Sequence, residues 1–228
     1  MPRLPVMRRW DWAAPPAPVH REVLSAAAGT DTGRPPLLFV PDAGNGAAAF
    51  GPVWLPSAAS RRFPAYALSL RGHGGSGGAE LWRRTLLRDY AYDVLQVTAA
   101  LPVRPVLVGH GFGALVVARV LGGYPARAAV LLAPRRPAAR ESQPPLVRAQ
   151  AMLSRAPGPP LGEPPVLVVG DRSASAAEAH RLARHYDATA VWVDGLDLGE
   201  RRPLDLVLDW VTRVAAPVVG AKATVAGR

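Results

Sequence analysis

The most informative stretch of the sequence is Val106-Leu107-Val108-Gly109-His110-Gly111-Phe112-Gly113. Its first three residues form a short apolar run typical of a buried strand, and residues 112–121 have the apolar content of a packed helix. Between them a glycine stands at every second position, so the backbone can take dihedral angles that other residues avoid. We therefore predict a strand that turns sharply into a helix at Gly111.

Similar apolar runs recur on both sides of this turn. Because they lack polar alternation and are separated by helical patterns, they predict a mostly parallel sheet covered by helices on both faces. The predicted strands are residues 19–26 (an edge strand), 37–40, 65–70, 106–108, 128–132, 166–169 and 190–193, and the predicted helices are residues 86–101, 112–121, 175–186 and 204–214.

The chain of 228 residues has the length of one domain. We expect residues 19–214 to form it. Residues 1–18 contain five prolines and are expected to be irregular, and residues 215–228 are expected to form a flexible tail. Residues 134–165 contain nine prolines and five arginines, which indicates a short, proline-rich and basic lid inserted after a core strand.

The positive charge of the chain is large but scattered. The formal net charge is +10, which is compatible with nucleic acid or an acidic partner. Arginine pairs such as Arg8-Arg9 and Arg201-Arg202 are spread along the chain and form no stripe with aromatic residues, so we expect no nucleic-acid partner. Lys222 is the only lysine, and this arginine bias, with abundant alanine, glycine and proline, is typical of a GC-rich bacterial genome.

Several kinds of site are excluded by the composition. The sequence has no cysteine, so it has neither disulfides nor thiolate metal sites, and its five histidines lack metal-ligand spacing. We expect no metal and no cofactor. No apolar run approaches the roughly 20 residues of a membrane span, and the N-terminus lacks a signal-peptide pattern, so we expect a cytoplasmic protein with no membrane partner. The sequence does not indicate the oligomeric state.

Four motifs resemble those of the α/β-hydrolase superfamily, and they occur in the order that this family has. The glycine turn at residues 109–113 is similar to the family's nucleophile elbow, G-x-S-x-G, and residues 40–44 (Val-Pro-Asp-Ala-Gly) are similar to its oxyanion loop, H-G-x-G. Residues 70–76 (Leu-Arg-Gly-His-Gly-Gly-Ser) resemble the D-x-R-G-H-G-x-S loop, and residues 89–94 resemble the helix before the elbow strand. The resemblance covers roughly residues 19–214 and implies a three-layer α/β-hydrolase fold with a short lid.

The resemblance also implies that the catalytic machinery is missing. In this family the nucleophile is followed along the chain by an acid and then by a histidine. Gly111 stands in the nucleophile position, Ser173 in the acid position and Leu196 in the base position. Asp171 lies near the acid position but two residues out of register. Since acyl transfer needs a hydroxyl, a base that accepts its proton and an acid that orients the base, we expect no hydrolysis.

An oxyanion hole is implied to survive, because it is built from backbone N–H groups. The amides of Ala43 and Phe112 would form it, and Phe112 opens a helix whose N-terminus favours negative charge. With basic lid residues nearby, we expect the pocket to bind a small molecule that carries a carbonyl or carboxylate group. Asp42, His110 and His73 are the other candidate pocket residues.

These three side chains also have structural interpretations. For Asp42 we favour a turn residue that caps its own backbone over a carboxylate facing the pocket as a general acid or base. His110 occupies a position that serves packing in the family, and His73 is expected to be a structural hydrogen-bonding residue of its loop.

Three functions are compatible with this sequence. The first is a pseudoenzyme that keeps a small-molecule pocket. The second is a non-hydrolytic biosynthetic enzyme of the cyclase, lyase or isomerase type, which would shape its substrate in the same pocket. The third is a true ester or amide hydrolase with a displaced triad. The fold alone does not distinguish these three functions, so they must be distinguished by the residues of the site.

Overall fold

The computed structural model describes residues 16–29, 32–81, 84–136, 158–172 and 176–215. Seven strands form one sheet in the order β1-β3-β2-β4-β5-β6-β7, in which β1 is antiparallel to β3 and every other pair is parallel. The strands are β1 (Val23–Ala26), β2 (Leu37–Val40), β3 (Ala65–Leu68), β4 (Val106–His110), β5 (Ala128–Leu132), β6 (Val166–Asp171) and β7 (Thr189–Val193). The mostly parallel sheet predicted from the sequence is confirmed.

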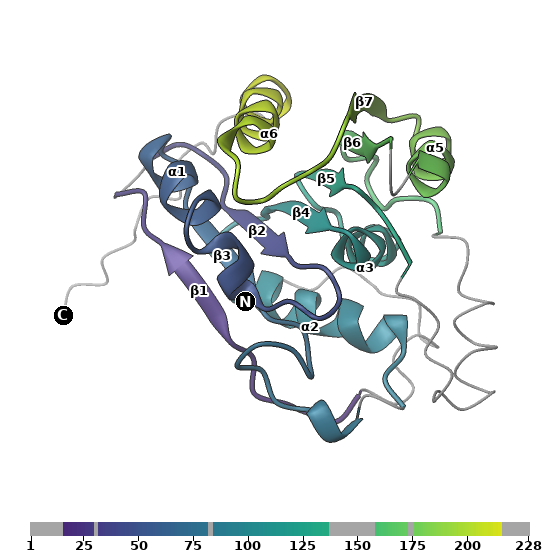
Figure 1. The fold of residues 1–228 in the computed structure, drawn as a ribbon. Coiled ribbons are helices and arrows are strands. Elements are labelled where there is room, and N and C mark those ends of the chain that lie inside the picture. Colours follow the sequence, from purple (N-terminus) through teal and green to yellow (C-terminus); the bar gives the residue numbers. More distant parts are fainter. Residues whose placement is uncertain (1–15, 30–31, 82–83, 137–157, 173–175, 216–228) are drawn as a thin grey trace.

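Helices cover both faces of this sheet, which gives three layers (Figure 1). The helices are α1 (Trp54–Ser60), α2 (Leu87–Ala100), α3 (Phe112–Leu121), α5 (Ala176–His185) and α6 (Arg201–Val214), with short 3-10 helices at Ala47–Phe50 and Ala79–Leu81. Helices α2, α3 and α5 pack on one face, and α1 and α6 pack on the other.

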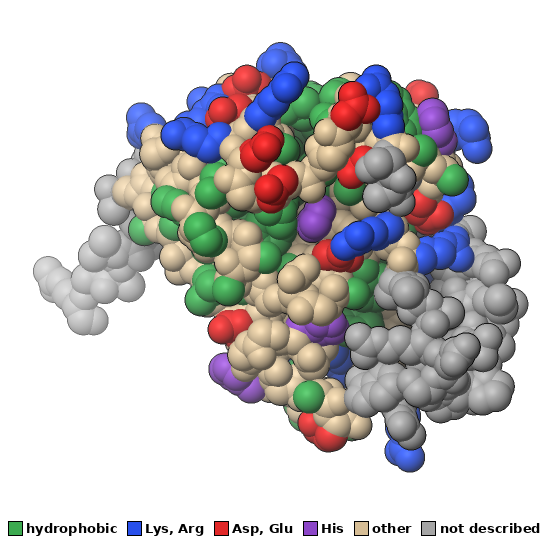
Figure 2. Space-filling model, viewed as in Figure 1, with side chains coloured by type: hydrophobic (Ala, Val, Ile, Leu, Met, Phe, Trp, Pro, Cys, Tyr) green, Lys and Arg blue, Asp and Glu red, His purple; other side chains and the backbone are tan. Residues whose placement is uncertain are grey.

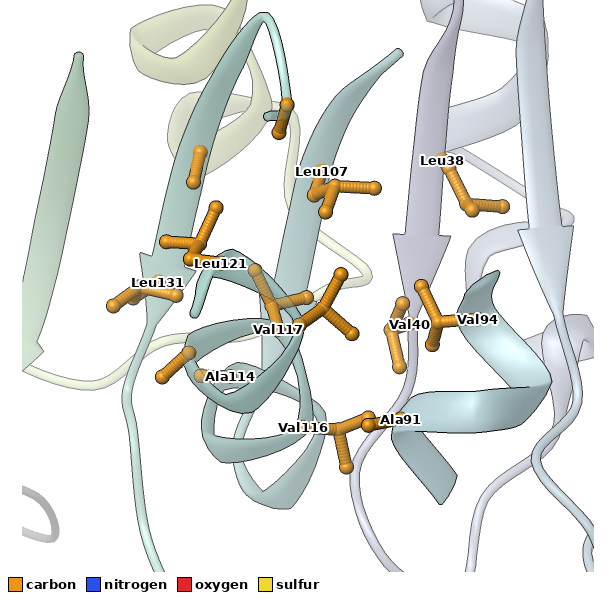
Figure 3. Packing of buried hydrophobic residues seen from close by; sticks show 14 of the residues in the cluster. Leu38, Val40, Ala91, Val94, Leu107, Ala114, Val116, Val117, Leu121 and Leu131 are labelled. Carbon is orange, nitrogen blue, oxygen red and sulfur yellow. The ribbon is translucent and has the colours of Figure 1, made fainter. Parts of the chain in front are cut away.

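The central strands are buried on both sides because each of their faces meets a helix layer. Along β2 and β4, successive side chains alternate between two apolar clusters, so Leu38 and Leu107 contact the α2/α3 layer while Phe39 and Val108 face α1 and α6. Figure 3 shows the first cluster, where side chains of α3 such as Val117 fill the space between the strands and the helices. These residues are fully buried. This packing holds β4 and α3, the two arms of the predicted glycine turn, rigidly against the sheet.

Two local differences from the sequence-based expectation have clear causes. The edge strand β1 is shorter than residues 19–26, because only Val23–Ala26 pairs with β3. Helix α1 was not predicted, because its seven residues include a proline and make too few turns to show a periodic pattern. Trp54 in α1 is fully buried and donates a hydrogen bond from Nε1 to the Leu198 carbonyl at 2.8 Å, so it serves the core.

The carboxyl ends of β2, β4 and β5 lie side by side, with Val40 opposite Gly109 and His110 opposite Leu132. The strand order reverses between β2 and β4, and loops that leave a sheet at such a point diverge and leave room for a site. The loop after β2, the turn after β4 and the loop after β5 therefore meet here. Residues 137–157, the larger part of the predicted lid, lie outside the described residues, as do residues 1–15 and 216–228.

Candidate functional site

The glycine turn has the shape that its sequence predicts. Gly111 lies between β4 and α3 with φ 57° and ψ −117°, a conformation that is strained for residues with a side chain. Its N–H donates to the Leu132 carbonyl at 2.9 Å, which pins the turn to β5. The flanking glycines allow a close approach of backbones. A Cβ at Gly113 would lie 2.8 Å from the Val40 carbonyl carbon, and one at Gly109 would lie 2.6 Å from the Ala114 Cα.

The carboxylate of Asp42 occupies the space in which a side chain at position 111 would begin. A Cβ added to Gly111 would lie 2.8 Å from Asp42 Oδ2 and closer still to Cγ and Oδ1. The Phe112 amide donates to Asp42 Oδ1 at 2.6 Å, across 70 residues of sequence. Asp42 is only 3% exposed. Asp42 therefore does more than the predicted capping of its own turn: the Ala43 amide of that turn contributes to its environment, and its side chain also reaches the first turn of α3.

Arg135 completes this group, and sequence reasoning missed its individual role. Its Nε donates to Asp42 Oδ2 at 2.9 Å, and its Nη2 contacts the same oxygen. Its backbone N–H donates to the Gly111 carbonyl at 3.2 Å. The chain reaches this position because Ala133, just after β5, has a positive φ of 40° and redirects the loop. The Arg135 side chain remains 52% exposed, so the ion pair reaches the protein surface.

This environment keeps Asp42 ionised. Burial alone would raise the pKa of its carboxyl group, but hydrogen bonds from Arg135 and from the Phe112 amide outweigh burial and lower the pKa below its ordinary value. The Ala43 amide acts in the same direction. The two amides that the family resemblance assigned to an oxyanion hole therefore both favour a negative charge at this place, and the charge they favour belongs to the chain itself.

His110 lies beside this group at the end of β4. Burial lowers the pKa of its imidazole; Asp42 opposes that shift and Arg135 adds to it. Its Nδ1 is buried and has no hydrogen-bond partner among the described residues. Both observations favour a neutral imidazole, because a charged ring would lack compensation here.

His73 does not touch the Asp42 group directly. Its Nδ1 lies 2.9 Å from the Arg71 carbonyl, and its ring meets the edge of Tyr90. Tyr90 in turn makes an edge contact with Phe112, with ring centroids 5.3 Å apart. Among the described residues, ring contacts link His73 to the start of α3 through Tyr90.

The positions that the family resemblance assigns to the base and the acid lie after β7 and β6. Leu196 follows β7 and packs, partly buried, against the apolar cluster under α6. Asp171 ends β6 and is buried, while Ser173 lies outside the described residues. In the described part of the chain, no histidine is hydrogen-bonded to a serine or threonine hydroxyl, since the ring contacts of His73 and His185 are to backbone carbonyls.

Charged side chains of both signs and histidine gather near the middle of the face that Figure 2 shows, over the ends of the central strands seen in Figure 1. Among the described residues, no three histidine, aspartate or glutamate side chains are grouped closely enough to hold a metal ion. None of the helices in the described ranges is long and apolar enough to cross a membrane.

Solved structures with this fold are numerous, although their sequences differ widely from this chain. A carboxylesterase structure from the thaumarchaeon Nitrososphaera gargenis superposes with a TM-score of 0.66 at 11% identity, covering 88% of this chain and 97% of that one. The enol-lactonase of Burkholderia xenovorans gives 0.61 at 16% identity (86% and 95% covered), and the Est1E structure from Butyrivibrio proteoclasticus with ferulic acid bound gives 0.61 at 14% identity (86% and 94% covered).

At these identities the likeness concerns the fold alone. No curated protein matches the chain in sequence. The family model described as "Alpha/beta hydrolase family", however, matches residues 37–226, which is most of the chain. Together with the seven-stranded sheet and the glycine elbow, this match shows that the chain belongs to the α/β-hydrolase family.

Proposed function

We propose that this protein is a non-hydrolytic member of its family, a pseudoenzyme that keeps a small-molecule pocket. The observation that carries the proposal is the position of the Asp42 carboxylate. It fills the space in which a nucleophilic side chain at position 111 would begin, and it accepts the hydrogen bond of the Phe112 amide. A working hydrolase of this fold needs that amide for the substrate's oxyanion.

The residues in the three triad positions support the same conclusion. Gly111 has no side chain to attack a carbonyl, and Leu196 cannot accept a proton. Ser173 cannot stabilise an imidazolium as a carboxylate does. Even a serine restored at position 111 would have no base to activate it, and its Cβ would collide with Asp42.

A ligand with a carbonyl or carboxylate group fits the chemistry of the pocket best. The Phe112 and Ala43 amides and the Arg135 guanidinium all stabilise negative charge at one place. The Est1E structure holds ferulic acid, an acid ligand on the same fold. Because the Asp42 carboxylate holds this place in the structure, native mass spectrometry of the wild type and of Asp42→Gly side by side would test for a co-purifying molecule of this class, which we expect with the variant.

The direct test is hydrolysis of an activated ester, with three proteins compared side by side. We expect no turnover above the buffer rate from the wild type, from Gly111→Ser, or from the double variant Asp42→Gly/Gly111→Ser, in which the added hydroxyl has room. A fluorophosphonate probe, which labels activated serines, should label none of them. Turnover by the wild type, or its labelling at a single serine, would contradict the proposal and support a hydrolase with a displaced triad.

A non-hydrolytic biosynthetic enzyme of the cyclase, lyase or isomerase type is a second candidate, and His110 is the observation that favours it. A buried imidazole with an unpartnered Nδ1 beside Asp42 could accept a proton from a bound substrate. Asp42 itself is a poor general acid, because its environment keeps it ionised. If a co-purifying molecule is found and is chemically converted on incubation with the wild type but not with His110→Gln, this second function would replace the first.

A further inference from the structure

We infer that Asp42 is an internal ligand that keeps the oxyanion hole closed, and that an external carboxylate can enter the hole only when the Asp42 carboxylate is out of it. This inference deepens the proposed function, on which it rests for the location of the pocket. It assigns an autoinhibitory role to one side chain and a chemical class to the group that would replace it.

The first step of the argument is that the hole is intact. The Phe112 amide at the start of α3 points at an oxygen 2.6 Å away, which is the geometry expected of an anion at a helix N-terminus. The Ala43 amide favours the same negative charge. Neither group depends on the residue at position 111, so the substitution of the nucleophile leaves the hole able to bind an anion.

The second step is that the hole is full. The carboxylate of Asp42 is almost entirely buried, with one oxygen on the Phe112 amide and the other on Arg135. An external anion would have to share this space with a charge of the same sign, which costs free energy at any separation within the site. The occupied hole therefore excludes carboxylates from the wild-type protein in this conformation.

The third step is that one partner of the contact is open to solvent. Arg135 is half exposed, whereas the Phe112 amide belongs to the first turn of α3, which packs in the core. Removal of the Asp42 side chain should leave two amides and one arginine facing the same vacant space. A small carboxylate would then satisfy all three donors as Asp42 does.

The test is a titration of the full-length protein with formate, the smallest carboxylate, followed by ¹⁵N–¹H spectra. In Asp42→Gly, the Phe112 and Ala43 amide signals should shift saturably, with an affinity about tenfold or more above that of the wild type. Asp42→Asn keeps the space filled without the charge, so it should resemble the wild type. Formamide, which is uncharged, should cause no saturable shift in any of the proteins.

Two further variants make the result specific to the site. Arg135→Gln in the Asp42→Gly background should weaken formate binding about tenfold, because a charged donor is lost. Arg136→Gln, which alters the neighbouring exposed arginine that pairs with Glu178, should leave formate binding unchanged. If Asp42→Gly does not fold, Asp42→Ala replaces it in each comparison.

The inference is overturned if formate shifts these amides in the wild type as strongly as in Asp42→Gly, since the hole would then be open. It is also overturned if neither small variant binds formate. Both readouts are independent of ester hydrolysis, so failure of this inference and failure of the proposed function are distinguishable.

Discussion

Asp42 and Asp93 are buried aspartates that each pair with an arginine, and they serve different parts of the protein. Asp93 in α2 is fully buried, and Arg71, itself 3% exposed, contacts both of its oxygens at 2.8 and 2.7 Å. Arg21 adds a further bond at 3.0 Å. Asp42 is equally hidden from solvent, but its partner Arg135 lies half in water.

The comparison shows that burial of an aspartate does not by itself reveal its role. The pair of Asp93 and Arg71 has both members inside and joins α2 to the loop after β3, so removal of Asp93 would leave the Arg71 guanidinium buried without its counter-charge. The Asp42 pair has one member that water can solvate when the contact opens. The first arrangement holds the fold together, and the second fits a site. Four experiments test this distinction.

The largest effect should come from Asp93→Ala. Removal of this carboxylate leaves the buried guanidinium of Arg71 without its counter-charge, and such losses cost about 3–5 kcal/mol of unfolding free energy. Denaturant unfolding would measure it. The matched control is Asp205→Ala, which breaks the exposed pair with Arg61 and should cost about 0–1 kcal/mol. Equal costs for the two variants would remove the basis of the comparison.

Gly111→Ala should have the next largest effect. A methyl group here faces a strained φ and collides with the Asp42 carboxylate, and overpacking of this kind costs about 1–3 kcal/mol. Asp42→Gly in the same chain should recover part of that cost. The double-mutant cycle should give a coupling of about 0.5–3 kcal/mol between the two positions.

Gly122→Ala is the control for this cycle. Gly122 has helical dihedral angles, and an added Cβ would meet its nearest atom at an ordinary 3.6 Å. We expect little loss of stability and no coupling to Asp42. Strict additivity of Gly111→Ala and Asp42→Gly would mean that the Asp42 carboxylate does not occupy the space at position 111.

Asp42→Asn should have a smaller effect, and that effect should depend on pH. The pKa of Asp42 is lower in the folded protein than in the unfolded chain, where it is about 3.9. Its ionisation therefore stabilises the fold fully above that unfolded value, and the contribution is lost as the pH falls through the folded pKa. The difference in unfolding free energy between the wild type and Asp42→Asn should shrink below about pH 4. A constant difference from pH 7 to pH 2 would contradict the ion pair with Arg135.

The smallest effect concerns His110. Burial lowers its pKa, so the unfolded chain binds this proton more readily than the folded protein does. Stability should therefore fall as the pH drops below the unfolded value of about 6.5, until the folded pKa is passed. His110→Gln should show less of this loss between pH 7 and 5, measured by denaturant unfolding at each pH. A loss as large as that of the wild type would contradict the burial of the His110 ring.

The sequence-based expectations agree with the structure where the signal is local. Residues 37–40, 112–121 and 128–132 form the predicted elements with the predicted bounds, because apolar runs in a doubly covered sheet have sharp edges. Helix α1 was missed, since seven residues are too few for a period to be recognised. The turn itself could be predicted, because the glycines at positions 109, 111 and 113 stand between a strand pattern and a helix pattern in one short stretch. Of their close contacts, those of Gly109 lie within this stretch, whereas Gly113 meets the Val40 and Pro41 carbonyls and Gly111 meets Asp42.

The contacts of Asp42 with Phe112 and Arg135 at the end of the sheet could not be predicted in the same way. Asp42 was favoured as a local turn residue, and Arg135 was only one of several basic residues in the predicted lid. No local sequence pattern indicates that two residues 93 positions apart form an ion pair. The nearest available signal was that the loops after three neighbouring parallel strands leave the sheet at one edge.

Residues close together in sequence were therefore enough to predict most strands and helices and the family. They also show that position 111 carries no hydroxyl. The tertiary fold alone determined that the Asp42 carboxylate takes the vacant space, accepts the Phe112 amide and pairs with Arg135. Electrostatic interactions depend on distance in space, and only the folded sheet brings these loops close to one another.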